Sequence, residues 1–66
     1  MNLTDEEAIR RCIAGVVRSK DRRGHHQNQA ALEARLLIGG TTPTIARMTA
    51  QAARRVGEAI AAKAKA

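Results

Sequence analysis

The chain has 66 residues, 12 lysines and arginines against 6 aspartates and glutamates, and no Phe, Tyr or Trp. A chain of this length forms one small domain, and 14 of its apolar residues are alanine, so its core is thin. Small domains of this kind are usually stabilised by disulfides, a metal or a second subunit, and a single Cys excludes an internal disulfide. We therefore expect one domain over residues 1–66 that is oligomeric, most simply a homodimer, and that works in a reducing cytoplasm.

The formal charge of +6 favours an anionic partner. Three of the six acidic residues are Asp5, Glu6 and Glu7, so from residue 8 onward 12 basic residues face 3 acidic ones, a net of +9. The longest uncharged stretch, residues 36–46, contains two glycines and a proline. We therefore expect no membrane-spanning segment and no secretion signal.

The first expected helix covers residues 5–19. Thr4 and Glu7 form a capping box at its start, and apolar residues then recur at three- and four-residue spacing, among them Ile9, Cys12 and Val16. A polar, basic connection from Arg18 to His26 follows.

The second expected helix covers residues 26–38 and ends at the glycine pair Gly39-Gly40. Its apolar residues lie around most of its circumference, which predicts a helix packed between others. These residues are Ala30, Leu32, Ala34, Leu36, Leu37 and Ile38.

The third expected helix covers residues 43–63, because Thr42 and Pro43 are typical of an N-cap and a first helical position. Residues 64–66 are expected to fray. Its larger apolar residues predict a core stripe: Ile45, Met48, Ala52, Val56, Ala59 and Ile60. Beside this stripe runs a row of small residues that permits close helix packing, either within the domain or, as we expect, at an oligomer interface: Ala46, Ala50, Ala53 and Gly57. The sequence predicts an all-α, three-helix domain.

Residues 34–48 carry the most specific pattern in the chain. Gly39 follows a hydrophobic helix end, Thr41 is a hydroxyl residue in a short turn, and Thr44 and Ile45 open the next helix. This pattern resembles the helix-turn-helix superfamily of DNA-binding proteins, including the compact regulators often encoded by phages and mobile elements. Two positions depart from the family: Gly40 replaces the usual Val or Ile, and Arg35 replaces the usual small residue.

The resemblance implies a small, basic DNA-binding regulator of transcription. Residues on the third helix are expected to meet double-stranded DNA, since Arg pairs with guanine and Gln with adenine: Thr42, Thr44, Arg47, Gln51 and Arg54. Contacts to the phosphate backbone are expected from Arg18, Lys20, Arg22, Arg23 and Thr41.

The alternative is an ordinary helical hairpin in a homo-oligomer. Such a protein would act as an inhibitor or adaptor and bind an acidic partner protein or a phosphorylated, nucleotide-like ligand. The crossing of the second and third helices separates the two hypotheses. A steep crossing with Arg47 exposed favours DNA binding, and a long antiparallel hairpin favours the oligomeric binder.

Other chemistry finds little support. His25 and His26 with Cys12 do not reproduce a zinc spacing, so no metal or other cofactor is expected. Cys12 lies on the apolar stripe of the first helix and is interpreted as a core residue. Ser19 is the only serine, and no pattern of nucleophile and base is present, so we do not expect an enzyme. The third helix lacks the large apolar anchors of a membrane-surface helix.

Overall fold

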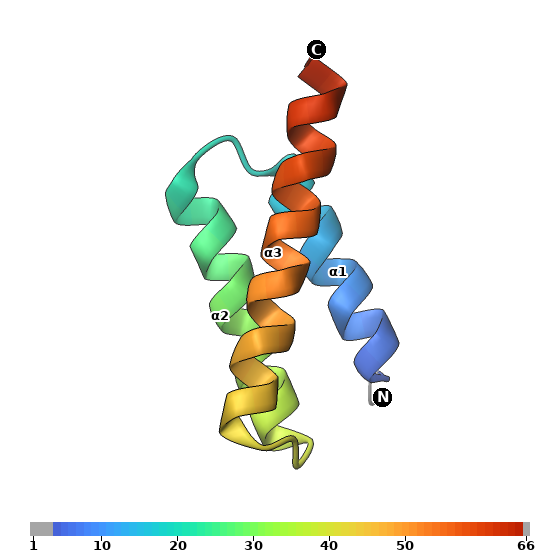
Figure 1. The fold of residues 1–66 in the computed structure, drawn as a ribbon, viewed down its shortest axis with the longest axis vertical. Coiled ribbons are helices and arrows are strands. Elements are labelled where there is room, and N and C mark those ends of the chain that lie inside the picture. Colours follow the sequence, from blue (N-terminus) through green and yellow to red (C-terminus); the bar gives the residue numbers. More distant parts are fainter. Residues whose placement is uncertain (1–3, 66) are drawn as a thin grey trace.

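The computed structural model describes residues 4–65, and within that range the chain forms three α-helices and no strand. They are α1 (Asp5–Arg18), α2 (Arg22–Ile38) and α3 (Pro43–Lys65). In Figure 1, α3 lies in front of the other two, with α2 on one side and α1 on the other. α1 and α3 run in one direction and α2 in the other. The prediction of an all-α, three-helix domain is confirmed.

α1 begins where the capping box places it. The Thr4 hydroxyl accepts a hydrogen bond of 3.2 Å from the Glu7 backbone N–H, which satisfies one of the free donors of the first turn. The helix ends at Arg18, and the Ser19 N–H donates to the Gly15 carbonyl at 3.0 Å.

α2 begins four residues earlier than the predicted residue 26. Asp21 is its N-cap, because the carboxylate accepts a 2.9 Å hydrogen bond from the Gly24 N–H. The predicted connection from Arg18 to His26 is therefore mostly helical, and only residues 19–21 join α1 to α2.

The turn between α2 and α3 is a Schellman motif. The Thr41 N–H donates to the Leu36 carbonyl at 2.9 Å and the Gly40 N–H to the Leu37 carbonyl at 3.1 Å. Gly40 adopts a φ of 99°, the conformation that this position requires. The Thr42 carbonyl accepts from the Ala46 N–H, and Pro43 is the first residue of α3, as predicted. α3 continues to Lys65, two residues beyond its predicted end, and Ala66 lies outside the described residues.

The core is built largely from small side chains. Its buried residues come from all three helices: Ala8, Cys12, Val16, Leu32, Leu36, Ala46, Ala50 and Ala53. On α2 only Leu32 and Leu36 are buried, so the prediction of a helix enclosed on most sides is wrong.

The two faces of α3 are reversed with respect to the predictions. The buried face is the small-residue row, Ala46, Ala50, Ala53 and Gly57, which packs on α1 and α2 within one chain. The row therefore lies inside the domain and is not an oligomer interface. The predicted core stripe instead faces outward, with Ile45, Met48, Val56 and Ile60 about half exposed. Close approach of the helices is the physical reason, since a Cβ on Gly57 would meet the Val16 Cβ at 2.7 Å.

Candidate functional site

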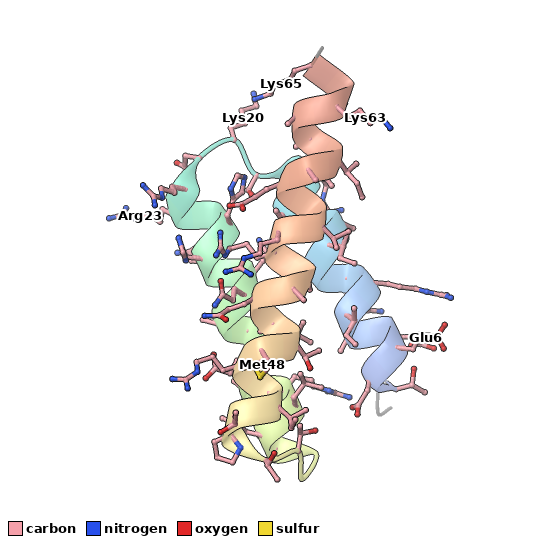
Figure 2. All side chains as sticks on the ribbon, in the orientation of Figure 1. Glu6, Lys20, Arg23, Met48, Lys63 and Lys65 are labelled. Atoms are coloured by element: carbon pink, nitrogen blue, oxygen red, sulfur yellow. The ribbon has the colours of Figure 1, made fainter. Side chains whose placement is uncertain are left out.

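Six basic side chains gather at one end of the three-helix domain. The connection between α1 and α2 lies at the same end as the last turns of α3 (Figure 1). Figure 2 shows the side chains of Lys20, Arg23, Lys63 and Lys65 around this end. All six are exposed, and we call them the basic end: Arg18, Lys20, Arg22, Arg23, Lys63 and Lys65. Residues about forty positions apart in sequence thus place their positive charges at one end of the domain.

Local hydrogen bonds fix the backbone that carries these side chains. The Ser19 hydroxyl donates to the Val16 carbonyl at 2.9 Å, which closes the last turn of α1. The Asp21 cap starts α2 two residues later. Because the connection is so short and capped at both sides, Lys20 and Arg22 project from a defined backbone.

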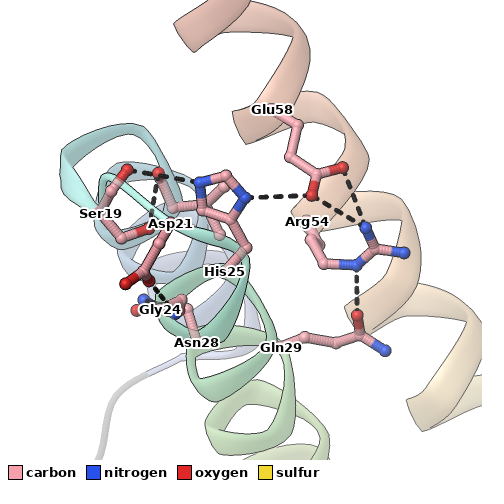
Figure 3. Close-up of polar contacts among 9 residues, drawn as sticks. Ser19, Asp21, Gly24, His25, Asn28, Gln29, Arg54 and Glu58 are labelled. Atoms are coloured by element: carbon pink, nitrogen blue, oxygen red, sulfur yellow. Dashed lines mark hydrogen bonds and ion pairs between the residues drawn. The ribbon is translucent and has the colours of Figure 1, made fainter.

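A polar network ties this connection to α3. In Figure 3, His25 lies between two acceptors: its Nδ1 is 3.1 Å from the Glu58 carboxylate, and its Nε2 is 3.3 Å from the Ser19 carbonyl. A neutral imidazole carries one N–H, so only the protonated ring donates both hydrogen bonds. The His25 side chain is 18% exposed and holds residue 19 close to α3.

Arg54 completes the network from within α3. Its Nη1 donates to both oxygens of Glu58 at 2.9 Å, and its Nε donates to the Gln29 side chain. Burial raises the pKa of Glu58, but the hydrogen bonds and charges of Arg54 and His25 outweigh it and hold that pKa below its ordinary value. The negative charge of the Glu58 carboxylate is therefore balanced by its partners inside the network. The Asp21 carboxylate is occupied as the N-cap of α2. The excess positive charge of the basic end remains on its surface.

The structure separates the two sets of residues that the sequence assigned to DNA. Thr42, Thr44 and Arg47 are exposed at the start of α3, and Gln51 is partly buried one turn further on. Thr41 lies in the adjacent turn, at the opposite end of the domain from the basic end. Thr44 and Lys63 are 19 residues apart on one helix, which corresponds to about 28 Å. Arg54 lies between the ends and is engaged with Glu58.

α2 and α3 form a long antiparallel hairpin. His25 contacts Glu58 and Gln29 contacts Arg54, so the residue numbers of both pairs have the same sum, as in two antiparallel helices side by side. The helices of a helix-turn-helix unit cross at about 90–120° instead. The left-handed glycine is Gly40 and not Gly39, the position matched to the turn glycine of that family. By the criterion of helix crossing, this geometry favours binding by helix surfaces.

Several residues of this region were missed by the sequence interpretation. The sequence pattern assigns no binding role to Lys63 and Lys65, which lie at the predicted end of the third helix. The contact of His25 with Glu58 joins residues 33 positions apart, so no local pattern indicates it. The Asp21 cap could have been predicted from the sequence alone, because Asp is one of the residues preferred at a helix N-cap.

Cys12 lies in the core, as predicted. It is 4% exposed, its thiol donates to the Asn28 carbonyl at 3.4 Å, and burial raises its pKa. A pocket between α1 and α2 is lined by Cys12 together with Arg11 and Arg35. Among residues 4–65, no three His, Cys, Asp or Glu side chains come together as metal ligands would. Within the same range, no helix combines the length and apolarity needed to cross a bilayer.

Comparison with known protein families, curated proteins and solved structures gives no match to this chain.

Proposed function

We propose that this protein binds duplex DNA through the phosphate backbone, with the basic end as its contact surface. The observation that carries this proposal is the convergence of six exposed basic side chains from the α1–α2 region and the end of α3. Lys and Arg side chains that neutralise phosphates release condensed counterions, and this release supplies most of the sequence-independent affinity for DNA.

The composition favours a duplex over a single strand. Proteins that bind single-stranded nucleic acid commonly stack bases on aromatic side chains, and this chain has no Phe, Tyr or Trp. A surface of flexible, positively charged side chains without stacking platforms fits the regular phosphate lines of a double helix.

The antiparallel hairpin shapes the mode of binding. α3 lies along α2 and does not project as a separate recognition helix, so we do not assign base reading to Arg47 or Gln51. We therefore propose DNA as the partner and a helical surface as the mode of contact, the mode expected for the alternative of a helical hairpin.

A salt titration with paired variants tests the proposal. Labelled duplex DNA is titrated with the chain between about 50 and 200 mM salt, and the slope of log affinity against log salt is measured. Six phosphate contacts predict a slope of about −5. Substituting both Arg22→Ala and Arg23→Ala is expected to weaken every duplex alike and to reduce the steepness by about 2.

Arg10→Ala together with Arg47→Ala is the matched control. It removes the same charge from exposed positions away from the basic end. The proposal expects a much smaller loss of affinity for this pair. It is overturned if the control pair weakens binding as much as the Arg22 and Arg23 pair, or if no duplex binds at low salt.

A further inference from the structure

The outward face of α3 is an apolar stripe that no part of residues 4–65 covers. Its larger side chains expose about half of their surface: Ile45 54%, Met48 59%, Val56 47% and Ile60 46%. Ala52 and Ala59 are exposed between them. We call these six residues the outer stripe. A soluble chain normally turns such a stripe toward its core, and contiguous exposed apolar patches mark interaction sites.

The outer stripe is unpartnered because α1 and α2 occupy the other face of the helix. The small-residue row that they cover is centred about a third of a turn away around α3. In Figure 1, α3 stands in front of both helices, and in Figure 2 Met48 lies on its forward side.

We infer that a second copy of this chain covers the outer stripe, with the two α3 helices antiparallel and the two-fold axis at Ala52. This inference goes beyond the proposed function and does not rest on it. The core of the single chain is thin and rich in alanine, and oligomerisation is one of the ways in which such small domains are stabilised.

The residue pattern of the stripe is self-complementary about Ala52. In an isologous interface, residue i contacts j and j contacts i, so paired residue numbers have a constant sum. An axis at Ala52 pairs Ile45 with Ala59 and Met48 with Val56 of the other copy. A large side chain therefore meets a small one near each end, and the smallest apolar side chain lies where the helices approach most closely.

The charges at the two ends of the stripe select the antiparallel direction. The Asp5 carboxylate lies beside Gly39, so the acidic first turn of α1 is next to the start of α3. The other end of α3 carries Lys63 and Lys65. In an antiparallel pair with the axis at Ala52, the lysine-bearing end of one α3 lies at the end of the domain where the other copy carries its acidic turn. A parallel pair would place lysines against lysines.

The size of the stripe predicts a modest affinity. From Ile45 to Ile60 the helix extends about 22 Å, or about four turns. One pair of helices over this length lies in the small class of interfaces, below about 1,200 Å² in total. We therefore expect dissociation in the micromolar range.

Sedimentation equilibrium between about 10 and 500 µM, without nucleic acid, tests for the dimer. The wild-type chain is expected to dimerise, and Ala52→Glu is expected to raise the dissociation constant at least about tenfold, because it places two carboxylates at the axis. Ala34→Glu is the control, since Ala34 is exposed on α2 and both substitutions exchange alanine for glutamate in a helix. The inference is overturned if the wild type is monomeric at the highest concentration, or if both variants associate equally well.

Disulfide trapping tests the direction. Cys12→Ala chains carrying either Ile45→Cys or Ala59→Cys are oxidised separately and as a mixture. The mixture is expected to form cross-linked dimers and each chain alone is not, because equivalent positions would lie about 21 Å apart along the axis, far beyond the ~7 Å limit between Cα atoms. Cross-linking of either chain with itself, or none in the mixture, contradicts the antiparallel pair.

The two proposals fail separately. Loss of the dimer in the Ala52→Glu chain leaves Arg22 and Arg23 unchanged, and a chain that dimerises without binding DNA overturns only the proposed function.

Discussion

Gly57 of α3 lies so close to Val16 of α1 that a Cβ on the glycine would come within 2.7 Å of the Val16 Cβ. Val16 is fully buried, and the Ile13 carbonyl would be only 3.1 Å away, so neither neighbour has room to move. This contact sets the spacing of α1 and α3, and it explains why the small-residue row faces inward.

Gly57→Ala is therefore expected to destabilise the fold. Overpacking costs about 1–3 kcal/mol, and the better helix propensity of alanine returns about 1 kcal/mol, so we expect a net loss of up to about 2 kcal/mol. Urea denaturation measures this free energy of unfolding. A variant more stable than wild type would mean that α1 and α3 are not in contact at this position.

Gly40 and Gly39 form a matched pair for the turn between α2 and α3. Gly40→Ala is expected to cost about 1–2 kcal/mol, because a side chain is strained at a φ of 99°. Gly39 has a φ of −77°, and its nearest neighbours leave room for a Cβ, so Gly39→Ala is expected to change stability by less than about 0.5 kcal/mol. Equal effects of the two substitutions on the melting temperature would contradict the Schellman geometry.

The network at Glu58 predicts a pH dependence of stability. Its pKa in the folded chain is below the ordinary value of 4.5, so its stabilising contribution is complete above that value and is lost as the pH falls through the folded pKa. Glu58→Gln is expected to cost about 1 kcal/mol or less at neutral pH, since the pair is partly exposed. The variant is also expected to lose less stability than wild type between pH 5 and pH 3, measured by urea denaturation at each pH. Glu33→Gln serves as the control, and an identical acid response of all three chains would refute the role of the network.

Cys12 is expected to react slowly with thiol reagents. It is buried, so a reagent reaches the thiol only when the helices open, and burial also raises its pKa and so disfavours the reactive thiolate. We expect its modification to be at least about 100-fold slower than that of a cysteine placed by Ala34→Cys in a Cys12→Ala chain. Similar rates for the two chains would show that the contact between α1 and α2 is open.

The number, order and most boundaries of the helices could be predicted because their signals are local. The Thr4 and Glu7 capping box, the glycines after Ile38, and Pro43 each fix a helix end through hydrogen bonds or a dihedral angle within a few residues. The start of α2 was predicted too late because Gly24 was taken as part of a linker, whereas Asp21 caps a helix that contains it.

Which face of α3 is buried could not be predicted from the apolar pattern alone. The aliphatic stripe through Val56 is the more hydrophobic one and therefore the expected core. α1 approaches α3 too closely at Gly57, however, for the buried face to carry a large side chain at that position. Which face is buried depends on how closely the three helices pack, and no single segment of the sequence determines that spacing. The basic end could not be predicted for the same kind of reason, because Lys63 lies at the same end of the domain as Lys20 only as a result of the length and direction of α3.

Amide chemical-shift mapping of the isotope-labelled chain with a short DNA duplex locates the surface that contacts the phosphates. We expect the largest shifts at residues 18–23 and 63–65, their loss at high salt, and little change at residues 41–47. Shifts concentrated on Thr44, Arg47 and Gln51, or no shifts at low salt, would contradict the basic end as the contact surface.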